Sequence, residues 1–176
     1  MTVHVITATR HGSTPEIGEA IAGHLRERGW DAVAEDPVSA DLQPGEPVVL
    51  GSPIYMGKWV KAGREIADRL AEEESGRAIW LFTVGPLGDP PKPDDPGPEK
   101  EVQEFARWHA ISSRLFEGKL DRSQLNRRER LAVRAVKAPV GDFRPWDEIE
   151  AWAEEIADAL GCREDQDARE AADSRH

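Results

Sequence analysis

Apolar positions along this chain fall into short continuous runs, separated by segments in which apolar residues recur every three or four positions. The runs are rich in β-branched residues and too short for helices, so they predict buried strands. The periodic segments predict amphipathic helices, the first with Ile17, Ile21 and Leu25 on one stripe. Strands are predicted at 3–8, 31–35, 47–52, 78–84 and 115–118, and helices at 15–28, from Trp59 to Leu70, at 99–109, 123–137 and 146–160.

The order of these elements indicates the fold class. Strands that alternate with helices predict an α/β fold on a parallel sheet, and 176 residues suit one domain. Residues 37–47 carry three prolines and a glycine, which is too broken for a crossover helix. Residues 90–98 contain five prolines and predict an insertion-like loop over 89–111. We expect a domain over residues 1–160 and a polar, frayed tail over 161–176.

Charge and composition exclude several function classes. The formal net charge of −11 disfavours binding to nucleic acid or to an anionic membrane surface. No apolar run reaches transmembrane length and nothing resembles a signal peptide, so a cytoplasmic location is expected. Cys162 is the only cysteine, which leaves no disulfide or zinc knuckle within one chain, and no metal site is predicted. The basic stretch 114–137 is either a solvated helix face or a docking surface for an acidic partner.

The segment between the first strand and the first helix carries candidate chemistry. It reads Thr-Arg-His-Gly-Ser-Thr over residues 9–14 and precedes Pro15, with Thr14 as the expected N-cap and Pro15 as the first helical residue. Unpaired amides at a helix N-terminus, the positive end of the helix dipole and hydroxyl donors together favour an anion such as phosphate. The fingerprints G-x-G-x-x-G and G-x-x-x-x-G-K-[ST] are absent here, which argues against NAD and ATP in their usual folds.

Two further loops follow predicted strand ends, at 51–58 and 83–90. In an open parallel sheet, ligands bind beyond the carboxyl ends of the strands, where the strand order reverses. The loop at 51–58 offers flat or soft apolar groups beside a glycine, and the loop at 83–90 offers two glycines and a hydroxyl. A phosphate at one end and a flat ring at the other describe a mononucleotide with a large aromatic head.

These loops resemble those of a known family. The hexad T-R-H-G-S-T matches the flavodoxin phosphate-loop pattern [ST]-x-x-G-x-T, and G-S-P-I-Y-M-G (51–57) and T-V-G-P-L-G-D-P (83–90) stand where that family places its flavin-contacting loops. With the segments 118–121 and 141–146, they resemble the flavodoxin-like branch that contains menaquinone-dependent protoporphyrinogen IX dehydrogenase.

The resemblance implies a flavodoxin-like three-layer sandwich with a five-stranded parallel sheet of order 2-1-3-4-5 and bound FMN. The first loop would hold the phosphate, the second would lie along the isoalloxazine ring, and the third would line its other side. Arg10 and His11 depart from the short hydroxyl residues of electron-carrier flavodoxins. The implied cofactor-binding residues are Thr9, Arg10, His11, Gly12, Ser13, Thr14, Pro53, Ile54, Tyr55, Met56, Gly57, Thr83, Gly85, Pro86 and Gly88.

Several residues keep two interpretations. Trp59 is a core residue or a ring-stacking one, and its place at the start of an apolar stripe favours the core. Tyr55 stacks on the flavin or does not, with equal weight. His109 is a proton donor near a substrate or, in the favoured interpretation, a partly buried structural histidine, and His4 and His24 are packing or surface groups. No catalytic acid or base is assigned, because a flavin carries the electrons itself.

Three functions follow from these expectations. The favoured one is an FMN-dependent oxidoreductase, of the protoporphyrinogen-dehydrogenase-like type, that passes electrons between a flat organic substrate or quinone and bound FMN. The second is a flavodoxin-type electron carrier that docks to a redox partner protein, which the acidity of the chain favours. The third is a binding module that kept the fold and lost the cofactor.

Overall fold

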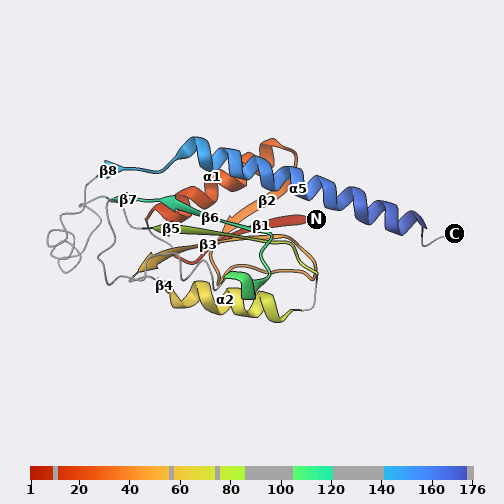
Figure 1. The fold of residues 1–176 in the computed structure, drawn as a ribbon, viewed down its shortest axis with the longest axis horizontal. Coiled ribbons are helices and arrows are strands. Elements are labelled where there is room, and N and C mark those ends of the chain that lie inside the picture. Colours follow the sequence, from red (N-terminus) through yellow and green to blue (C-terminus); the bar gives the residue numbers. More distant parts are fainter. Residues whose placement is uncertain (10–11, 56–57, 74–75, 86–104, 121–140, 174–176) are drawn as a thin grey trace.

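The computed structural model describes residues 1–9, 12–55, 58–73, 76–85, 105–120 and 141–173 of the chain (Figure 1). The described residues contain five longer strands, three helices, three two-residue strands and one 3-10 turn. The elements are β1 (Thr2–Thr7), α1 (Ser13–Glu27), β2 (Asp31–Glu35), β3 (Val48–Tyr55), β4 (Lys58–Trp59), α2 (Lys61–Glu72), β5 (Ile79–Gly85), η1 (Phe105–Trp108), β6 (Ser112–Glu117), β7 (Lys119–Leu120), β8 (Gly141–Asp142) and α5 (Trp146–Asp173).

The main sheet has the strand order β2-β1-β3-β5-β6, and every neighbouring pair in this order is parallel. Without the two-residue strand β4, which pairs antiparallel with the end of β3, this is the expected order 2-1-3-4-5. The α/β fold class and the strand order are therefore confirmed. The fifth strand, β6, begins at Ser112, three residues before the predicted start, because its first residues are polar and give no apolar signal.

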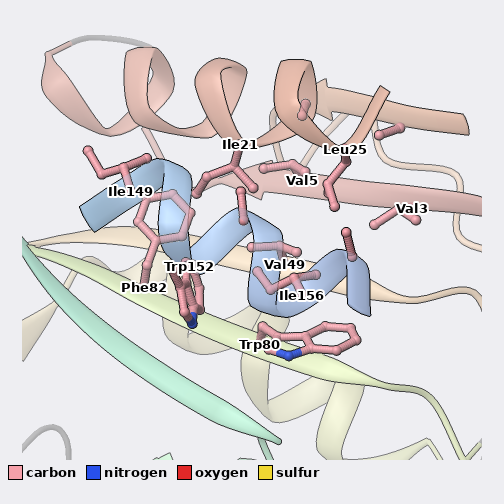
Figure 2. Close-up of a cluster of buried hydrophobic side chains, with 14 of the residues drawn as sticks. Val3, Val5, Ile21, Leu25, Val49, Trp80, Phe82, Ile149, Trp152 and Ile156 are labelled. Atoms are coloured by element: carbon pink, nitrogen blue, oxygen red, sulfur yellow. The ribbon is translucent and has the colours of Figure 1, made fainter. Parts of the chain in front are cut away.

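Helices cover both faces of this sheet, as expected for a three-layer fold (Figure 1). Because side chains alternate along a strand, β1 directs Val3 and Val5 to one face and Ile6 to the other. On the first face α1 and α5 lie side by side, and Figure 2 shows Ile21 of α1 and Trp152 of α5 packed over the strands.

The opposite face is covered by α2 and η1. Its core contains an aromatic group in which the ring of Trp59 lies 5.0 Å from that of Phe105 and 5.3 Å from that of Trp108. Trp59 is only 1% exposed, which confirms its core interpretation. It belongs to β4 rather than to a helix, and α2 starts at Lys61.

The connection from β2 to β3 contains no helix, as its prolines predict. Polar contacts hold it against the sheet instead. The ring of His4 lies between two carboxylates, with Nδ1 2.6 Å from Glu35 and Nε2 2.9 Å from Glu46. Burial alone would raise the pKa of Glu46, but hydrogen bonds from the Gln43 N–H and from His4 outweigh it and lower the pKa. Arg77 also donates to the main-chain oxygens of Gln43 and Glu46.

The last helix, α5, runs from Trp146 to Asp173, so the expected helix end at Leu160 is wrong, and residues 161–173 of the expected tail are helical. Gly161 does not stop the helix, because the residues after it are rich in Ala, Glu and Arg, which are strong helix formers. The added turns extend past the sheet (Figure 1). Among the described residues, no helix combines the length and apolarity needed to cross a bilayer.

Two other predicted helices lie partly or wholly outside the described residues. Of the predicted helix at 99–109, the described residues show a 3-10 turn at Phe105–Trp108, and residues 99–104 lie outside the described part. The predicted basic helix at 123–137 lies wholly outside it. The same is true of much of the predicted loop at 89–111.

Candidate functional site

The three loops singled out in the sequence leave the sheet at one edge. Thr7 of β1 pairs with Gly51 of β3, and the Ala8 N–H donates to the Gly51 carbonyl at 2.8 Å. Further along β3, Pro53 pairs with Val84 of β5. The carboxyl ends of these three central strands are therefore adjacent, and β1 and β3 are the two strands between which the chain reverses direction in the sheet order.

Helix α1 starts at this edge with a glycine as its N-cap. Gly12 has φ 87° and ψ −162°, a conformation that is essentially restricted to glycine, and no side chain caps the helix. The prediction of Thr14 as N-cap and Pro15 as first helical residue is wrong, since the helix already begins at Ser13. A threonine hydroxyl followed by proline favours that N-cap assignment, but the backbone of Gly12 turns the chain two residues earlier.

The first-turn amides of α1 have no acceptor within the helix. The first amides of a helix have no intrahelical acceptor, and Pro15 contributes none. Thr14 is 2% exposed and Ser13 is 8% exposed, so both hydroxyls lie inside the first turn rather than in bulk solvent. Thr9 and Gly12 flank residues 10–11, and the predicted contacts of Arg10 and His11 lie outside the described residues.

The hydroxyl of Ser13 also fixes a neighbouring segment. The Lys119 N–H donates to Ser13 Oγ at 2.6 Å, and a Cβ on the intervening Gly118 would lie only 3.1 Å from that oxygen. This contact docks β7 onto the first turn of α1. The sequence gives no sign of it, because the two residues are 106 positions apart.

The second loop begins as a continuation of β3. Pro53 is buried and Ile54 is 8% exposed, and they extend the apolar surface of the sheet to its carboxyl end. The backbone of Tyr55 pairs with Lys58 of β4, so residues 56–57 connect two antiparallel strands. The Tyr55 side chain, Met56 and Gly57 lie outside the described residues, and their flavin contacts stay predictions.

The third loop starts at the end of β5. Thr83 is 1% exposed, and its hydroxyl accepts a hydrogen bond from Trp59 Nε1 at 2.8 Å, which ties β5 to β4. Gly85 is half-buried at the strand end and offers only backbone to a ligand on the side away from Leu115. Pro86 and Gly88 lie outside the described residues.

A charged group that the sequence did not single out as chemistry lies beside the start of α1. Arg144 is 5% exposed at its side chain, pairs with Glu16 of α1 and with Asp142 of β8, and lies 4.4 Å above the ring of Trp146. The hydrogen bonds from Arg144 lower the pKa of Asp142 from 3.8 to about 2. Asp142 in turn raises the pKa of Arg144 above its already high ordinary value.

The three histidines in the described part of the chain, His4, His24 and His109, lie away from this edge. His109 follows η1, just before the Ile111 N–H donates to the Ile79 carbonyl at the amino end of β5, so it is at the opposite end of the sheet from the three loops. This position does not fit a proton donor at the site, and the exposed side chain of His109 does not fit the favoured interpretation, a partly buried structural histidine, either. His24 pairs with Glu154 across the α1–α5 surface, and His4 is a buried packing group.

The donor set at the carboxyl edge fits a phosphorylated flat ligand. Uncapped backbone amides and a helix dipole suit a phosphate ester, and the described strand ends present apolar side chains and a glycine backbone rather than charged groups. The described residues contain no cluster of histidine, cysteine and carboxylate groups suited to a metal ion.

Comparison with known proteins identifies the fold family. A family model for the flavodoxin domain matches residues 4–144. No curated protein is significantly similar in sequence. A flavodoxin from the domain Archaea is similar in structure, with a TM-score of 0.61 at 14% identity, over 92% of this chain and 99% of that chain.

Two further solved structures share the fold. A flavodoxin of Streptococcus pneumoniae TIGR4 gives a TM-score of 0.59 at 16% identity, over 90% of this chain and 99% of that chain. Rubredoxin oxygen:oxidoreductase from Desulfovibrio gigas gives 0.58 at 11% identity, over 92% of this chain but 36% of that longer one. The family match supports FMN as the cofactor. By the extent of that match, this chain belongs to the flavodoxin domain family.

Proposed function

We propose that this protein is an FMN-dependent oxidoreductase that passes electrons between a flat organic substrate or quinone and FMN bound at the carboxyl edge of the sheet. The observation that carries this proposal is the start of α1, where Gly12 adopts a conformation restricted to glycine and leaves the first-turn amides without a side-chain cap. That arrangement lies beside the ends of β3 and β5, where a ring joined to the phosphate would reach.

Each part of the edge would have a separate task. The amides of Ser13 and Thr14, with the hydroxyls of Thr9 and Thr14, would hold the phosphate. Pro53 and Ile54 would exclude water from one end of the ring, and Gly85 would let it approach the main chain. FMN, when bound, accepts or donates electrons, so the protein needs no acid or base of its own for that step.

The choice of an enzyme over an electron carrier rests on two long segments that follow strands at this edge. The chain inserts 20 residues, 121–140, between β7 and β8, and β7 is held to the first turn of α1 through Ser13. A second long segment follows Gly85 and ends at Phe105, which packs against Trp59. Long segments that follow strands at this edge, after β5 and after β7, suit a protein that must bind a second molecule beside the cofactor.

A finer proposal is that the activity is of the protoporphyrinogen-dehydrogenase-like type. It rests on the resemblance of the segments 9–14, 51–57, 83–90 and 141–146 to that branch. The structural neighbours carry no argument for it, because identities of 11 to 16% show the fold alone.

The test begins with cofactor retention. The purified protein is incubated with FMN, passed over a desalting column, and assayed for bound FMN by its absorption spectrum. Reduced holoprotein is then mixed anaerobically with menadione, and oxidised holoprotein with protoporphyrinogen and menadione, against free FMN at equal concentration. Quinone reduction faster than with free FMN supports the oxidoreductase. A protein that retains no FMN contradicts it and favours a module that lost the cofactor.

The second candidate function is a flavodoxin-type electron carrier. The net charge of −11 favours it, since acidic carriers meet basic partners electrostatically. Electron transfer to a reductase or ferredoxin-type protein would then be faster than to menadione and would slow as ionic strength rises. The same stopped-flow experiment with both acceptors distinguishes the two functions.

A further inference from the structure

We propose that Arg144 is a positioning residue for the cofactor phosphate: it neutralises Glu16 in the first turn of α1 and thereby sets how tightly the protein holds FMN relative to riboflavin. This inference rests on the proposed function, because it takes the FMN phosphate to lie at that helix terminus. The evidence is that the guanidinium of Arg144 contacts the carboxylates of both Glu16 and Asp142.

Glu16 stands in a position that poses an electrostatic problem. It is the acidic residue of the first turn of α1, and 49% of its side chain is exposed. A carboxylate there stabilises the free helix through the dipole. The same charge repels a phosphate dianion at the neighbouring amides, so it weakens the ligand that the turn is otherwise built to bind.

Arg144 offsets this charge at close range. Its guanidinium pairs with Glu16 on one side and donates from Nε to Asp142 Oδ1 at 2.7 Å on the other. It is 5% exposed at the side chain and lies over Trp146, so it cannot swing out into solvent without losing all three contacts. An arginine stays charged at every accessible pH, and the two carboxylates hold this one in place while they are ionised.

The same residue ties the phosphate-binding turn to the segment beside it. Asp142 lies in β8, which pairs with β7, and the Lys119 N–H of β7 donates to Ser13 Oγ. Two contacts from the β7–β8 hairpin therefore reach the first turn of α1, one through Ser13 and one through Arg144. Only the second contact involves charged groups. A substitution that removes the charge of Arg144 therefore leaves the hydrogen bond between Lys119 and Ser13 in place.

Three variants separate this role from a structural one. Arg144→Gln leaves Glu16 unneutralised, Glu16→Gln removes the repulsive charge, and the double variant removes both. Dissociation constants for FMN and for riboflavin, which lacks the phosphate, are measured by flavin fluorescence at low ionic strength. A single charge at a helix terminus changes an equilibrium about two- to fivefold.

The expected results differ in sign. Arg144→Gln weakens FMN binding about two- to fivefold, Glu16→Gln strengthens it by a similar factor, and the double variant returns close to the wild type, while the riboflavin constant stays the same throughout. Equal weakening of FMN and riboflavin by Arg144→Gln, or no gain with Glu16→Gln, would overturn the proposal. If Arg144→Gln does not fold, Glu16→Gln alone still decides. Failure of the wild type to bind FMN would instead refute the proposed function on which this role rests.

Discussion

The substitution Gly12→Ala, which adds one methyl group, tests whether the backbone conformation of Gly12 shapes the phosphate-binding turn. The Gly12 φ of 87° and ψ of −162° lie in a region that alanine avoids. Apart from its chain neighbours, no heavy atom of the described residues lies within 4 Å of the position that a Cβ would occupy. Gly12→Ala therefore introduces no steric clash in the described structure. Its whole effect is on the backbone conformation.

The size of that effect follows from the backbone angles. Holding a non-glycine residue in such a region costs about 1–3 kcal/mol. If the turn keeps its conformation, the cost lowers the free energy of unfolding. If the turn relaxes in the free protein, the cost is taken from FMN binding instead, and 1–3 kcal/mol corresponds to a loss in affinity of about 5- to 150-fold. The loss in the free energy of unfolding and the loss in the free energy of FMN binding should together be about 1–3 kcal/mol.

A matched control lies at the other end of the same helix. Gly29 has φ 90° and an equally open surrounding, and it closes a Schellman motif in which the Trp30 N–H donates to the Leu25 carbonyl at 3.0 Å. Gly29→Ala should cost about 1–2 kcal/mol of stability and leave the FMN affinity unchanged. Urea unfolding and FMN fluorescence titration are measured for both variants. Wild-type stability and affinity in Gly12→Ala, or an equal loss of affinity in Gly29→Ala, would refute the reasoning.

Three further outcomes are expected. The Asp142 carboxylate, with its lowered pKa, stabilises the fold above the ordinary pKa of 3.8 and loses that effect as the pH falls towards about 2. The difference in urea midpoint between wild type and Asp142→Asn should therefore shrink between these pH values. A constant difference down to pH 2 would contradict the Arg144 contact. Gly51→Ala should lower stability by about 1–3 kcal/mol, because the new Cβ would lie 2.0 Å from the Phe82 ring, and Phe82→Leu should restore part of it in the same assay. His109→Gly should keep or raise stability, because His109 has φ 54°, and it should leave FMN binding unchanged; weaker binding would place His109 at the site after all.

Sequence patterns predicted the parts of this fold that depend on local order along the chain. Short β-branched runs marked the parallel strands, and the stripe of Ile17, Ile21 and Leu25 marked α1 because these residues all face one core. The positions of the three loops at one edge followed from the parallel order of the strands. A glycine with positive φ after α1 also ended that helix where the sequence suggests, at Gly29.

The remaining features depend on contacts that local patterns do not carry. The N-cap at Gly12 follows from a backbone conformation that the sequence pattern does not show. The neighbouring Thr14 and Pro15 instead indicate an N-cap two residues later. The contact of Lys119 with Ser13 joins residues far apart in the sequence. The predicted end of α5 at Leu160 is wrong, because the glycine at 161 costs only about 1 kcal/mol in a helix and the residues after it include strong helix formers.

The central claim is that FMN binds at the carboxyl edge of the sheet with its phosphate on the first turn of α1. The most direct measurement is a titration of ¹⁵N-labelled protein with FMN, followed by amide chemical shifts. The account predicts saturable shifts concentrated at Gly12, Ser13, Thr14 and Gly85, and smaller shifts at the first three with riboflavin. Shifts centred on the amino edge, around Ile79 and Ile111, or none on addition of FMN, would contradict it.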